Sequence, residues 1–329
     1  MANPLSDTPS RTPLDARHFE EHRAVLTAHC YRMLGSIAEA EDAVQETMIR
    51  AIRASDGFEG RSSLRTWLCR IATRVCLDAL DGRRRRALPM ELGPANSIDG
   101  PIGTLPHAYF VEPVPDALIT PPDADPTELI SLKQSVRLAF VAALQHLPPR
   151  QRAALLLAEV LGWPVADIAE SLDVSTAAVN SMLQRARATL RSRDDEAAFE
   201  PLAEPESLLL ERYLEAFERY DIDALLSVVH EDATMCMPPY PIWLQGHETI
   251  RYWMLGPGIE CVGSRLIPTR ASGLPAFGQY RRAKSGDGHE PWSLIVLHAR
   301  DGAITWITHF LDTETLFPRF GLPPRLPAT

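Results

Sequence analysis

The stretch that most constrains how this chain can fold is residues 88–126. Nine of its 39 residues are proline, six are acidic, and none is lysine or arginine. Proline fixes φ and lacks a backbone N–H, so a stretch so rich in it cannot continue a helix or a central strand. We expect an extended linker that builds no core. The chain must then consist of separate folding units on either side of it.

The length and composition agree with several folding units. A chain of 329 residues is long for one domain, and a hydrophobic content of 45% can supply more than one core. No apolar run approaches the roughly 20 residues that cross a bilayer, and the N-terminal segment lacks the apolar core of a signal peptide. We therefore expect a cytoplasmic protein with no membrane contact. The five cysteines lack CxxC spacing, which favours buried thiols over a metal site, and nothing points to a cofactor.

The net charge of −10 conceals two basic segments. Arg50–Ala87 holds 10 arginines against 4 acidic residues, and Thr127–Arg193 holds 8 basic residues against 5 acidic ones. The remainder, from Asp194 onward, holds 11 basic and 20 acidic residues. Two basic segments joined to an acidic remainder predict a polyanionic partner for the first half of the chain alone.

Residues 15–87 carry the periodicity of three amphipathic helices. The apolar stripes are, in chain order, Leu26, Cys30, Met33 and Leu34; then Val44, Met48 and Ile52; then Leu64, Trp67, Leu68, Ile71, Ala72 and Val75. We expect the second helix to begin near Ala38, and Ser62 or Ser63 to cap the third. Arginines surround the third stripe, at Arg61, Arg65, Arg70, Arg74 and Arg83–Arg86.

Residues 127–193 contain a helix-turn-helix pattern. Pro164 opens a short helix, Asp173 and Val174 make a turn, and Ser175 caps a second helix. The second helix has an inward apolar stripe of Val179, Leu183, Ala186 and Leu190. Its outward residues are short polar groups that suit base edges, followed by arginines that can reach phosphates: Thr176, Asn180, Ser181, Gln184, Arg185 and Arg187. An ordinary helical hairpin with a solvated face is the alternative, and DNA binding is favoured over it.

Residues 205–325 are predicted to form an α+β domain. A helical pattern from Leu208 is followed by five strand-like runs, with glycine-containing turns between them. A short acidic joint with two prolines, residues 194–206, separates this domain from the preceding helices.

The first half of the chain resembles the extracytoplasmic-function (ECF) sigma factors of the sigma-70 family. The resemblance rests on HCYRMLGSIAEAEDAVQETMIRAIR, FEGRSSLRTWLCRIATRVCLDAL and LPPRQRAALLLAEVLGW, which follow the family's order and cover roughly residues 15–193. The acidic remainder resembles the SnoaL-like, ketosteroid-isomerase-like domain of one group of these factors, the SigG-like group. The resemblance implies a multidomain protein: two all-α helical domains, sigma region 2 and a helix-turn-helix region 4, then an α+β SnoaL-like cone.

The resemblance also implies promoter-directed transcription initiation, with core RNA polymerase and promoter DNA as partners. In the family, region 2 melts the −10 element and holds the non-template strand, a task that requires cations and a pocket for an unstacked base. The residues that match are Arg61, Ser63, Arg65, Trp67, Arg70, Arg74, Arg83 and Arg84, with the rest of the arginine run beside them. Trp67 can also be a core residue of the third helix, which is the interpretation that we favour.

Further contacts follow from the same resemblance. Region 4 would read the −35 element through the outward residues of its second helix and dock on the flap of the β subunit. Asp42, Gln45 and Glu46 match the surface that binds the clamp helices of the β′ subunit, although the residues alone indicate only a solvated acidic face. The linker 88–126 would cross the polymerase channel, where its lack of cations suits a path that nascent RNA takes.

A SnoaL-like cone encloses a cavity between a curved sheet and helices. The candidate lining residues are Tyr240, Trp243, Trp253, Trp292, Trp306 and His309, with Asp232 as a carboxylate. The sequence brings no two titratable residues together, so proton transfer of the isomerase kind has no support. We expect a regulatory domain and no enzyme, either an intramolecular brace on regions 2 and 4 or a sensor of a small-molecule ligand.

Two other interpretations remain open at this point. The chain could be a DNA-binding regulator that does not replace a sigma subunit, or a helix-turn-helix module fused to a small-molecule-binding or isomerase-like domain. Run-off transcription separates them, because only a sigma factor makes core polymerase start at a promoter.

Overall fold

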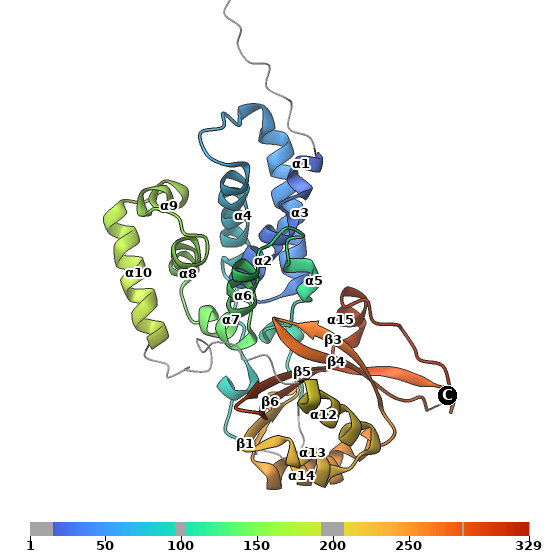
Figure 1. Ribbon diagram of the computed structural model, residues 1–329. Helices are drawn as coiled ribbons and strands as arrows, with labels where there is room; N and C mark the ends of the chain where they lie inside the picture. Colours follow the sequence, from blue (N-terminus) through green and yellow to red (C-terminus); the bar gives the residue numbers. More distant parts are fainter. Residues whose placement is uncertain (1–15, 96–102, 192–206, 285, 329) are drawn as a thin grey trace, which may run out of the picture.

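The chain folds into a helical body and an α+β domain that lie one above the other, as the computed structural model in Figure 1 shows. The structure describes residues 16–95, 103–191, 207–284 and 286–328. The joint expected at 194–206 lies outside these residues. The predicted fold class, helical domains followed by an α+β domain, is confirmed.

The first helical unit contains the three predicted helices and a short helix before them, and Ser63 caps the third as predicted. Its elements are α1 (Ala16–Glu20), α2 (Arg23–Leu34), α3 (Ile37–Ala54), the 3₁₀ turn η1 (Ser55–Gly57) and α4 (Leu64–Leu80). Ser36 and Ser63 cap α3 and α4, because each hydroxyl accepts a hydrogen bond from the backbone N–H three residues later. Gly35 ends α2 with a positive φ of 72°, which glycine adopts without strain.

The second helical unit contains the predicted helix-turn-helix as α9 and α10. Its elements are α6 (Pro126–Ser135), α7 (Leu138–Gln145), α8 (Pro149–Leu155), the π-helical turn η4 (Leu156–Val160), α9 (Val165–Leu172) and α10 (Thr176–Arg191). Asp173 ends α9 with a φ of 54°, and the Ser175 hydroxyl accepts a hydrogen bond of 3.2 Å from the Ala178 N–H. The inward stripe is buried as predicted: Val179, Leu183, Ala186 and Leu190.

The proline-rich segment between the two units is packed. It forms η2 (Pro89–Glu91), η3 (His107–Tyr109) and α5 (Asp116–Ile119), and residues 96–102 lie outside the described part. Its buried apolar side chains include Leu88, Phe110, Val111, Val114 and Ile119. The expectation of an extended, unpacked linker is therefore wrong for the described residues of this segment. Their apolar side chains are too sparse for a core of their own, but they fill the seam between the helical body and the sheet.

The α+β domain is built on a six-stranded sheet with strand order β2-β1-β6-β5-β4-β3. The strands are β1 (Val229–Cys236), β2 (Trp243–Gln245), β3 (Arg265–Ala271), β4 (Leu274–Arg282), β5 (His289–Arg300) and β6 (Ala303–Phe310). β1 runs parallel to β6, and the other neighbouring pairs are antiparallel. The helices are α12 (Ser207–Arg219), α13 (Ile222–Ser227), α14 (His247–Leu255), the 3₁₀ turn η5 (Pro257–Cys261) and α15 (Thr313–Arg319). The sequence predicts five strands and misses β2, which is too short to reveal a periodicity.

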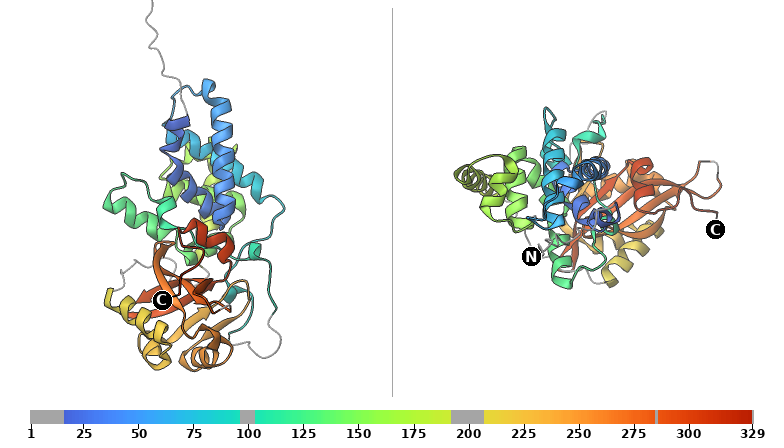
Figure 2. Two further views of the ribbon diagram at one scale, coloured as in Figure 1. Left: turned by 90° about the vertical axis from the view of Figure 1, so that its right-hand side faces the viewer. Right: turned by 90° about the horizontal axis from the view of Figure 1, so that it is seen from above.

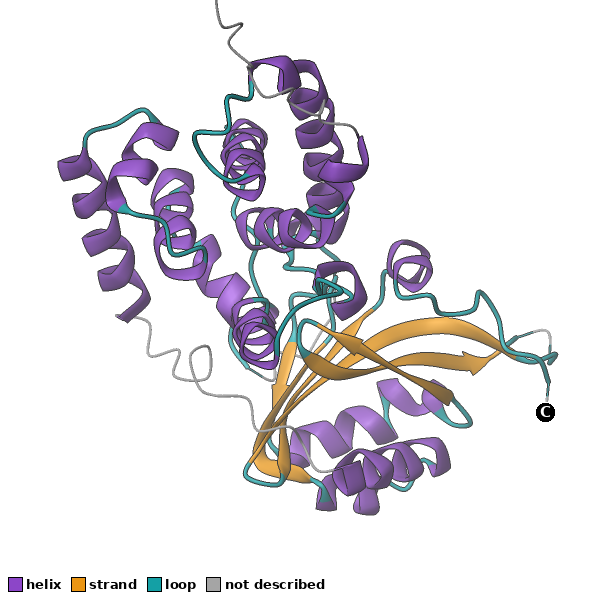
Figure 3. Ribbon diagram, turned by 45° about the horizontal axis from the view of Figure 1, so that its top comes forward, coloured by secondary structure: helices purple, strands orange, loops and turns teal. Residues whose placement is uncertain are grey.

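Both faces of the sheet are covered. Figure 3 shows α12, α13 and α14 on one face, where Phe217 and Ile295 belong to their common core. The other face packs on the helical body, and Leu274 and Val296 belong to the same buried cluster as Leu144 of α7. The side view and top view in Figure 2 show the helical body over this face, with the ends of β4 and β5 extending past it. The sheet is therefore a wall shared by two cores.

The tip of the β3–β4 hairpin docks into the helical body. The Ser272 N–H donates a hydrogen bond to the Val114 carbonyl (2.7 Å), and the Ser272 hydroxyl accepts one from the Val114 N–H (3.1 Å). The Gly273 N–H donates to the Asp116 carboxylate (2.7 Å). Gly273 has a φ of +75°, and a Cβ at this position would lie 2.7 Å from the backbone oxygen of Lys133 in α6. Only glycine fits this close approach without displacing α6.

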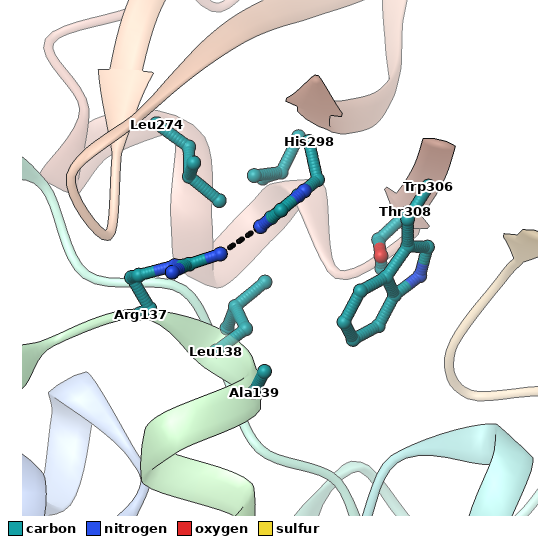
Figure 4. Close-up of a pocket in the computed structure, with 8 residues that line it drawn as sticks. Arg137, Leu138, Ala139, Leu274, His298, Trp306 and Thr308 are labelled. Atoms are coloured by element: carbon teal, nitrogen blue, oxygen red, sulfur yellow. Dashed lines mark hydrogen bonds between the residues drawn. The ribbon is translucent and has the colours of Figure 1, made fainter. Parts of the chain in front are cut away.

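A buried arginine and a half-buried histidine join the two parts at a second point. Arg137, just before α7, donates a hydrogen bond to Nε2 of His298 on β5, beside Leu274 and Trp306 (Figure 4). Burial, together with Arg137 and Arg300, lowers the pKa of His298 to about 4. The ring is therefore neutral near pH 7 and can accept the arginine's hydrogen.

Candidate nucleic-acid interface

Exposed arginines lie around α4, where the sequence predicts contact with a melted strand. Arg61, Arg65 and Arg74 are exposed, and the Arg61 side chain is 87% exposed. Arg61 lies 3.0 Å from the Glu59 carboxylate, and Arg65 lies 3.7 Å from that of Glu128 in α6. Exposed ion pairs contribute little free energy, so these arginines can exchange an acidic partner for a phosphate.

Ser63 and Trp67 have structural roles at the start of α4. The Ser63 hydroxyl accepts a hydrogen bond of 3.0 Å from the Thr66 N–H and so holds the first turn. The Trp67 ring is half-buried, with the rings of Phe19 and Phe58 at centroid distances of 6.4 Å and 5.1 Å. The structure therefore favours the core interpretation of Trp67 over a stacking platform for a base.

Arg70 points toward the second helical unit. Its guanidinium donates a hydrogen bond of 2.8 Å to the Glu170 carboxylate of α9, and α4 is also in contact with α8. The Arg70 side chain is 26% exposed. This contact therefore links α4, which is predicted to hold the melted strand, with α9, the first helix of the helix-turn-helix. In this arrangement the Glu170 carboxylate occupies the Arg70 guanidinium.

The arginine run after α4 divides into outward and inward side chains. Arg83 and Arg84 are exposed; Arg83 pairs with Glu39, and Arg84 lies over the Tyr109 ring, 5.5 Å from its centroid. Arg86 is buried, donates to the Phe110 carbonyl (2.8 Å) and pairs with Glu39 (3.1 Å). The expectation that the whole run holds DNA is therefore wrong for Arg86, which fastens the proline-rich segment to α3.

The outward residues of α10 form a continuous exposed face. All six predicted residues are exposed: Thr176, Asn180, Ser181, Gln184, Arg185 and Arg187. Thr176, Asn180 and Gln184 follow one another at intervals of four and so share one stripe of the helix. Arg187 donates a hydrogen bond of 3.0 Å to the Glu159 carboxylate in the same unit. Polar groups at the N-terminal end and a cation further along have the arrangement of a recognition helix.

The predicted polymerase contact lies on the outer side of α3, which we call the acidic face and define by Asp42, Gln45 and Glu46. Asp42 and Gln45 are exposed, and Glu46 is partly exposed. Glu41, at the edge of this face, pairs with Arg319 of α15 at 2.8 Å. The C-terminal domain therefore borders the acidic face directly.

Two buried arginines that join the helical units are missed by the sequence. Arg32 of α2 donates a hydrogen bond to the Ser135 hydroxyl (2.7 Å), and Arg152 of α8 donates to the Gln145 side-chain oxygen (2.6 Å) and to the Met33 carbonyl. Burial lowers the pKa of each guanidinium to about 10, which leaves both charged at pH 7. In the sequence, both appear only as arginines among apolar helical residues. That pattern does not distinguish an arginine at an internal boundary from one that contacts DNA.

The cavity of the C-terminal domain has a volume of about 330 Å³ and lies between the sheet and α12, α14 and η5. Tyr240, Trp253, Trp292 and His309 line it, as predicted. The lining also includes Arg281, Glu260 and Cys261, which no pattern in the sequence marks as lining residues.

Three other predicted lining residues lie elsewhere. The Trp243 indole donates a hydrogen bond of 2.9 Å to the Gly93 carbonyl, and Asp232 is exposed on β1. Trp306 faces the helical body beside Arg137. Successive residues of a strand point to opposite faces, so Trp306 and His309, three apart on β6, cannot line the same cavity.

Comparisons with known proteins agree with this organisation. Family models described as Sigma-70 region 2 and Sigma-70, region 4 match residues 18–86 and 137–190. The chain is 48% identical to the ECF RNA polymerase sigma factor SigG of Mycobacterium tuberculosis (strain ATCC 25618 / H37Rv), over 98% of this chain and 89% of that protein. It is 28% identical to the probable ECF RNA polymerase sigma factor SigI of the same strain, over 63% of this chain and 64% of that protein.

The crystal structure of the extracytoplasmic-function sigma factor SigJ of Mycobacterium tuberculosis has the same fold. The TM-score is 0.60 at 23% sequence identity, and the match covers 94% of this chain and 100% of that one. Among the described residues, none of the helices combines the length and apolarity that a bilayer crossing needs.

The similarity to SigG extends over nearly the whole chain, including the C-terminal domain. The predicted resemblance and the function that it implies are therefore confirmed, and a regulator or an enzyme with an attached DNA-binding module is set aside. The chain belongs to the ECF sigma factors, the initiation factors that direct RNA polymerase to specific promoters.

Proposed function

We propose that the structure is the resting form of this sigma factor, in which regions 2 and 4 hold each other closed until core polymerase binds. The observation that carries the proposal is the 2.8 Å ion pair between Arg70 of α4 and Glu170 of α9. In this ion pair, an acidic residue of the −35 module occupies an arginine that is expected to bind the −10 element. The buried Arg32 and Arg152 support the same closed arrangement.

The spacing of promoter elements requires this form to open. The −35 and −10 elements lie about 25 base pairs apart, which is about 85 Å of duplex at about 3.4 Å per base pair. In the closed form α4 is in contact with α8, so regions 2 and 4 cannot reach both elements at once. Core polymerase would drive the opening because it binds the separated regions, and a partner shifts an equilibrium toward the form that it binds better.

In the open form, each region would contact one promoter element. Region 2 would hold the melted −10 strand with the basic groups around α4: Arg61, Arg65, Arg70, Arg74, Arg83 and Arg84, with Ser63 at the start of the helix. Region 4 would insert α10 into the major groove at the −35 element, with Thr176, Asn180, Ser181 and Gln184 on base edges and Arg185 and Arg187 on phosphates. Trp67, which packs in the core, is left out of the strand contact.

Core polymerase would bind both regions. The acidic face of α3 would meet the clamp helices of the β′ subunit, and region 4 would meet the β flap. Because Arg319 of α15 holds Glu41 beside the acidic face, binding of the clamp would compete with docking of α15. Since transcription takes place in the cytoplasm, we expect the chain to act there.

The C-terminal domain would act as a brace on the closed form. Its β3–β4 tip, at Ser272 and Gly273, bonds to the proline-rich segment, and that segment bonds to α3 through Arg86. For this segment to cross the polymerase channel, it must first leave the seam that it now fills. Opening would therefore release the segment and the brace together.

Run-off transcription with core polymerase and the full chain tests the closed form. Glu170→Gln removes the partner of Arg70, so at limiting sigma concentration we expect about two- to fivefold more transcript, the effect of one exposed ion pair. Asp173→Asn is the matched control, because it removes a carboxylate at the end of the same helix and asparagine tolerates the positive φ. Transcript from Glu170→Gln at or below the level of Asp173→Asn would contradict the proposal.

The cavity supports a second role for the C-terminal domain. At about 330 Å³, with aromatic and methionine side chains in its wall, it has the size and lining of small-molecule sites. We propose that a ligand bound there adjusts how firmly the brace holds, which makes the domain a sensor.

A further inference from the structure

Most of the cavity wall is made of apolar side chains. Phe217 of α12, Trp253 and Met254 of α14, and Met235 and Met237 at the end of β1 form this part. Aromatic rings prefer other rings, and methionine adapts to irregular shapes while making favourable contacts with aromatic groups. The apolar part of the wall therefore favours a flat aromatic molecule.

A row of polar side chains crosses β4, β5 and β6 and ends at His309. The Gln279 amide donates a hydrogen bond to the Ser264 hydroxyl (3.1 Å), and the Ser293 hydroxyl donates one to the Gln279 side-chain oxygen (2.7 Å). A hydroxyl has a single hydrogen, so Ser293 can only accept from Nδ1 of His309, 3.3 Å away. The row therefore fixes the hydrogen of His309 on Nδ1 and leaves a lone pair on Nε2.

The surroundings of His309 keep its ring neutral. His309 is only 7% exposed, and burial together with Arg281 lowers its pKa to about 4. Above about pH 5 the Nε2 atom is therefore a hydrogen-bond acceptor. His309 lines the cavity, and no donor from the described residues bonds to its Nε2.

Arg281 supplies a donor on the same wall. Its guanidinium carbon lies 3.3 Å from the centroid of the Trp292 ring, and its Nη atoms donate to the Glu260 carboxylate (3.1 Å) and to the Cys261 sulfur (3.0 Å). These contacts hold the guanidinium in one orientation. The Arg281 Nε is buried and has no hydrogen-bond partner among the described residues. The guanidinium has more N–H groups than its contacts with Glu260 and Cys261 use, and a ligand oxygen in the cavity can accept from the others.

We infer that the cavity binds a flat aromatic molecule that carries a hydroxyl group and a carbonyl or carboxylate oxygen. The hydroxyl donates to Nε2 of His309, the oxygen accepts from the guanidinium of Arg281, and the rings lie against Phe217 and Trp253. The inference rests on the proposed sensor role of the C-terminal domain and names the chemistry of its ligand. Binding alone is inferred, with no chemical step.

Three related probes separate the two polar contacts. 4-Hydroxy-2-naphthoate has both groups, too far apart on the rings to bond to each other; 2-naphthoate lacks the hydroxyl, and 1-naphthol lacks the carboxylate. Calorimetric titration of the full chain should give the tightest binding for 4-hydroxy-2-naphthoate. We expect about fivefold weaker binding without the hydroxyl and at least about tenfold weaker binding without the carboxylate, because hydrogen bonds to charged groups are the stronger ones. Equal affinities, or no saturable binding at millimolar concentration, would overturn the inference.

Variants assign each contact to its residue. His309→Phe should abolish the preference for 4-hydroxy-2-naphthoate over 2-naphthoate, and Arg281→Met should abolish the preference over 1-naphthol. Arg282→Met, at the exposed neighbouring position, is the matched control and should keep both preferences. Ser293→Ala provides a second test of the row if His309→Phe does not fold, because without the Ser293 acceptor the hydroxyl preference should decrease. Variants that keep the wild-type preferences would overturn the inference.

These titrations are separate from the test of the closed form. The Glu170→Gln comparison reports on regions 2 and 4, whereas the probes report on the cavity of the resting chain. If the probes bind as expected but 4-hydroxy-2-naphthoate leaves run-off transcription unchanged, the sensor role fails and the binding site stands. If the probes do not bind, the closed form and its opening are unaffected.

Discussion

At the scale of single residues, buried cations decide how the parts of this molecule are joined. Arg32, Arg137 and Arg152 are each at most 3% exposed. A buried charge without compensation costs several kcal/mol, so each guanidinium needs acceptors around it. All three find acceptors across a boundary between folding units. The boundaries are therefore specified by polar groups as well as by apolar packing.

Arg152→Met should destabilise the helical body by about 3 kcal/mol. The substitution leaves the Gln145 side-chain oxygen and the Met33 carbonyl without their donor in a buried site. Urea unfolding followed by circular dichroism measures the loss. Arg150→Met, at an exposed position of the same helix, should remain within about 0.5 kcal/mol of the parent chain. Equal losses in the two variants would contradict this role of Arg152.

The Arg137–His298 contact should make docking of the C-terminal domain sensitive to acid. Because the pKa of His298 is lowered from 6.5 to about 4, the unfolded chain takes up a proton at a pH where the docked chain does not. The stabilisation is fully present above pH 6.5 and is lost as the pH falls toward 4, with about 2 kcal/mol lost between pH 7 and pH 5.

Unfolding free energies at pH 7 and pH 5 measure this effect. His298→Gln should show a smaller decrease than the parent chain, while other histidines with a lowered pKa, such as His309, contribute equally to both. His230→Gln, an exposed position on β1, serves as the control and should follow the parent chain. A decrease in His298→Gln as large as in the parent would show that docking does not depend on this histidine.

At this scale the sequence predicts local interactions and misses distant ones. Ser63 and Ser175 can be recognised as helix caps because their partners lie three residues away. The sequence assigns Arg70 and Arg86 to the DNA strand, yet in the closed form they bond to Glu170 and Glu39. The charge of an arginine indicates that it needs an anion but does not say which one.

At the scale of elements, the β3–β4 hairpin joins the domains by shape as well as by hydrogen bonds. Gly273 at its tip has a positive φ and lies against the backbone of α6. Gly302, at the β5–β6 turn, has a φ of +77° but nothing within 4 Å of a Cβ. The two glycines therefore differ only in whether a neighbour is present.

Gly273→Ala should weaken docking by more than Gly302→Ala does. Both substitutions carry the strain of a positive φ, but only the first places a Cβ 2.7 Å from the Lys133 carbonyl oxygen. We expect Gly273→Ala to lose about 2 kcal/mol more unfolding free energy, as overpacked sites do. Limited proteolysis should also cut faster within the proline-rich segment in that variant. Similar losses in both variants would mean that the tip is not held tightly.

On α10, base contacts and phosphate contacts can be told apart. Asn180→Ala should lose about 1–3 kcal/mol of binding free energy on a cognate promoter fragment and little on unrelated DNA. Arg185→Ala should weaken binding to both kinds of DNA. It should also reduce by about 1 the slope of the logarithm of the binding constant against the logarithm of the salt concentration. Fluorescence anisotropy of the polymerase complex at several salt concentrations measures both effects. An Asn180→Ala variant that binds all duplexes equally weakly would remove the base-reading role of this residue.

The elements that the sequence predicts well are those with a strong period of their own. The helix-turn-helix and the three helices of region 2 follow from apolar stripes and caps. The proline-rich segment is judged wrongly because its buried side chains, such as Val111 and Val114, pack on partners from other parts of the chain. Composition indicates whether a segment can form a core by itself, but it does not show that the segment packs against other parts of the chain.

At the scale of the whole molecule, the sheet separates two cores with different tasks. One face shares a continuous apolar cluster with regions 2 and 4, and the other encloses the cavity. The sequence predicts independent units, since it cannot reveal that Leu274 and Val296 pack in the same cluster as Leu144. Because one wall touches both the cavity and the helical body, occupation of the cavity and closure of regions 2 and 4 can influence each other.

The most direct test of the closed form follows the distance between regions 2 and 4 in the full chain. All five native cysteines are buried, so dyes can be attached selectively at Glu59→Cys, in the exposed loop before α4, and Ala188→Cys, on the exposed side of α10. Efficient energy transfer is predicted in the free chain, and a large decrease is predicted when core polymerase and promoter DNA are added. A complex that makes run-off transcript while its energy transfer stays at the value of the free chain would contradict the account.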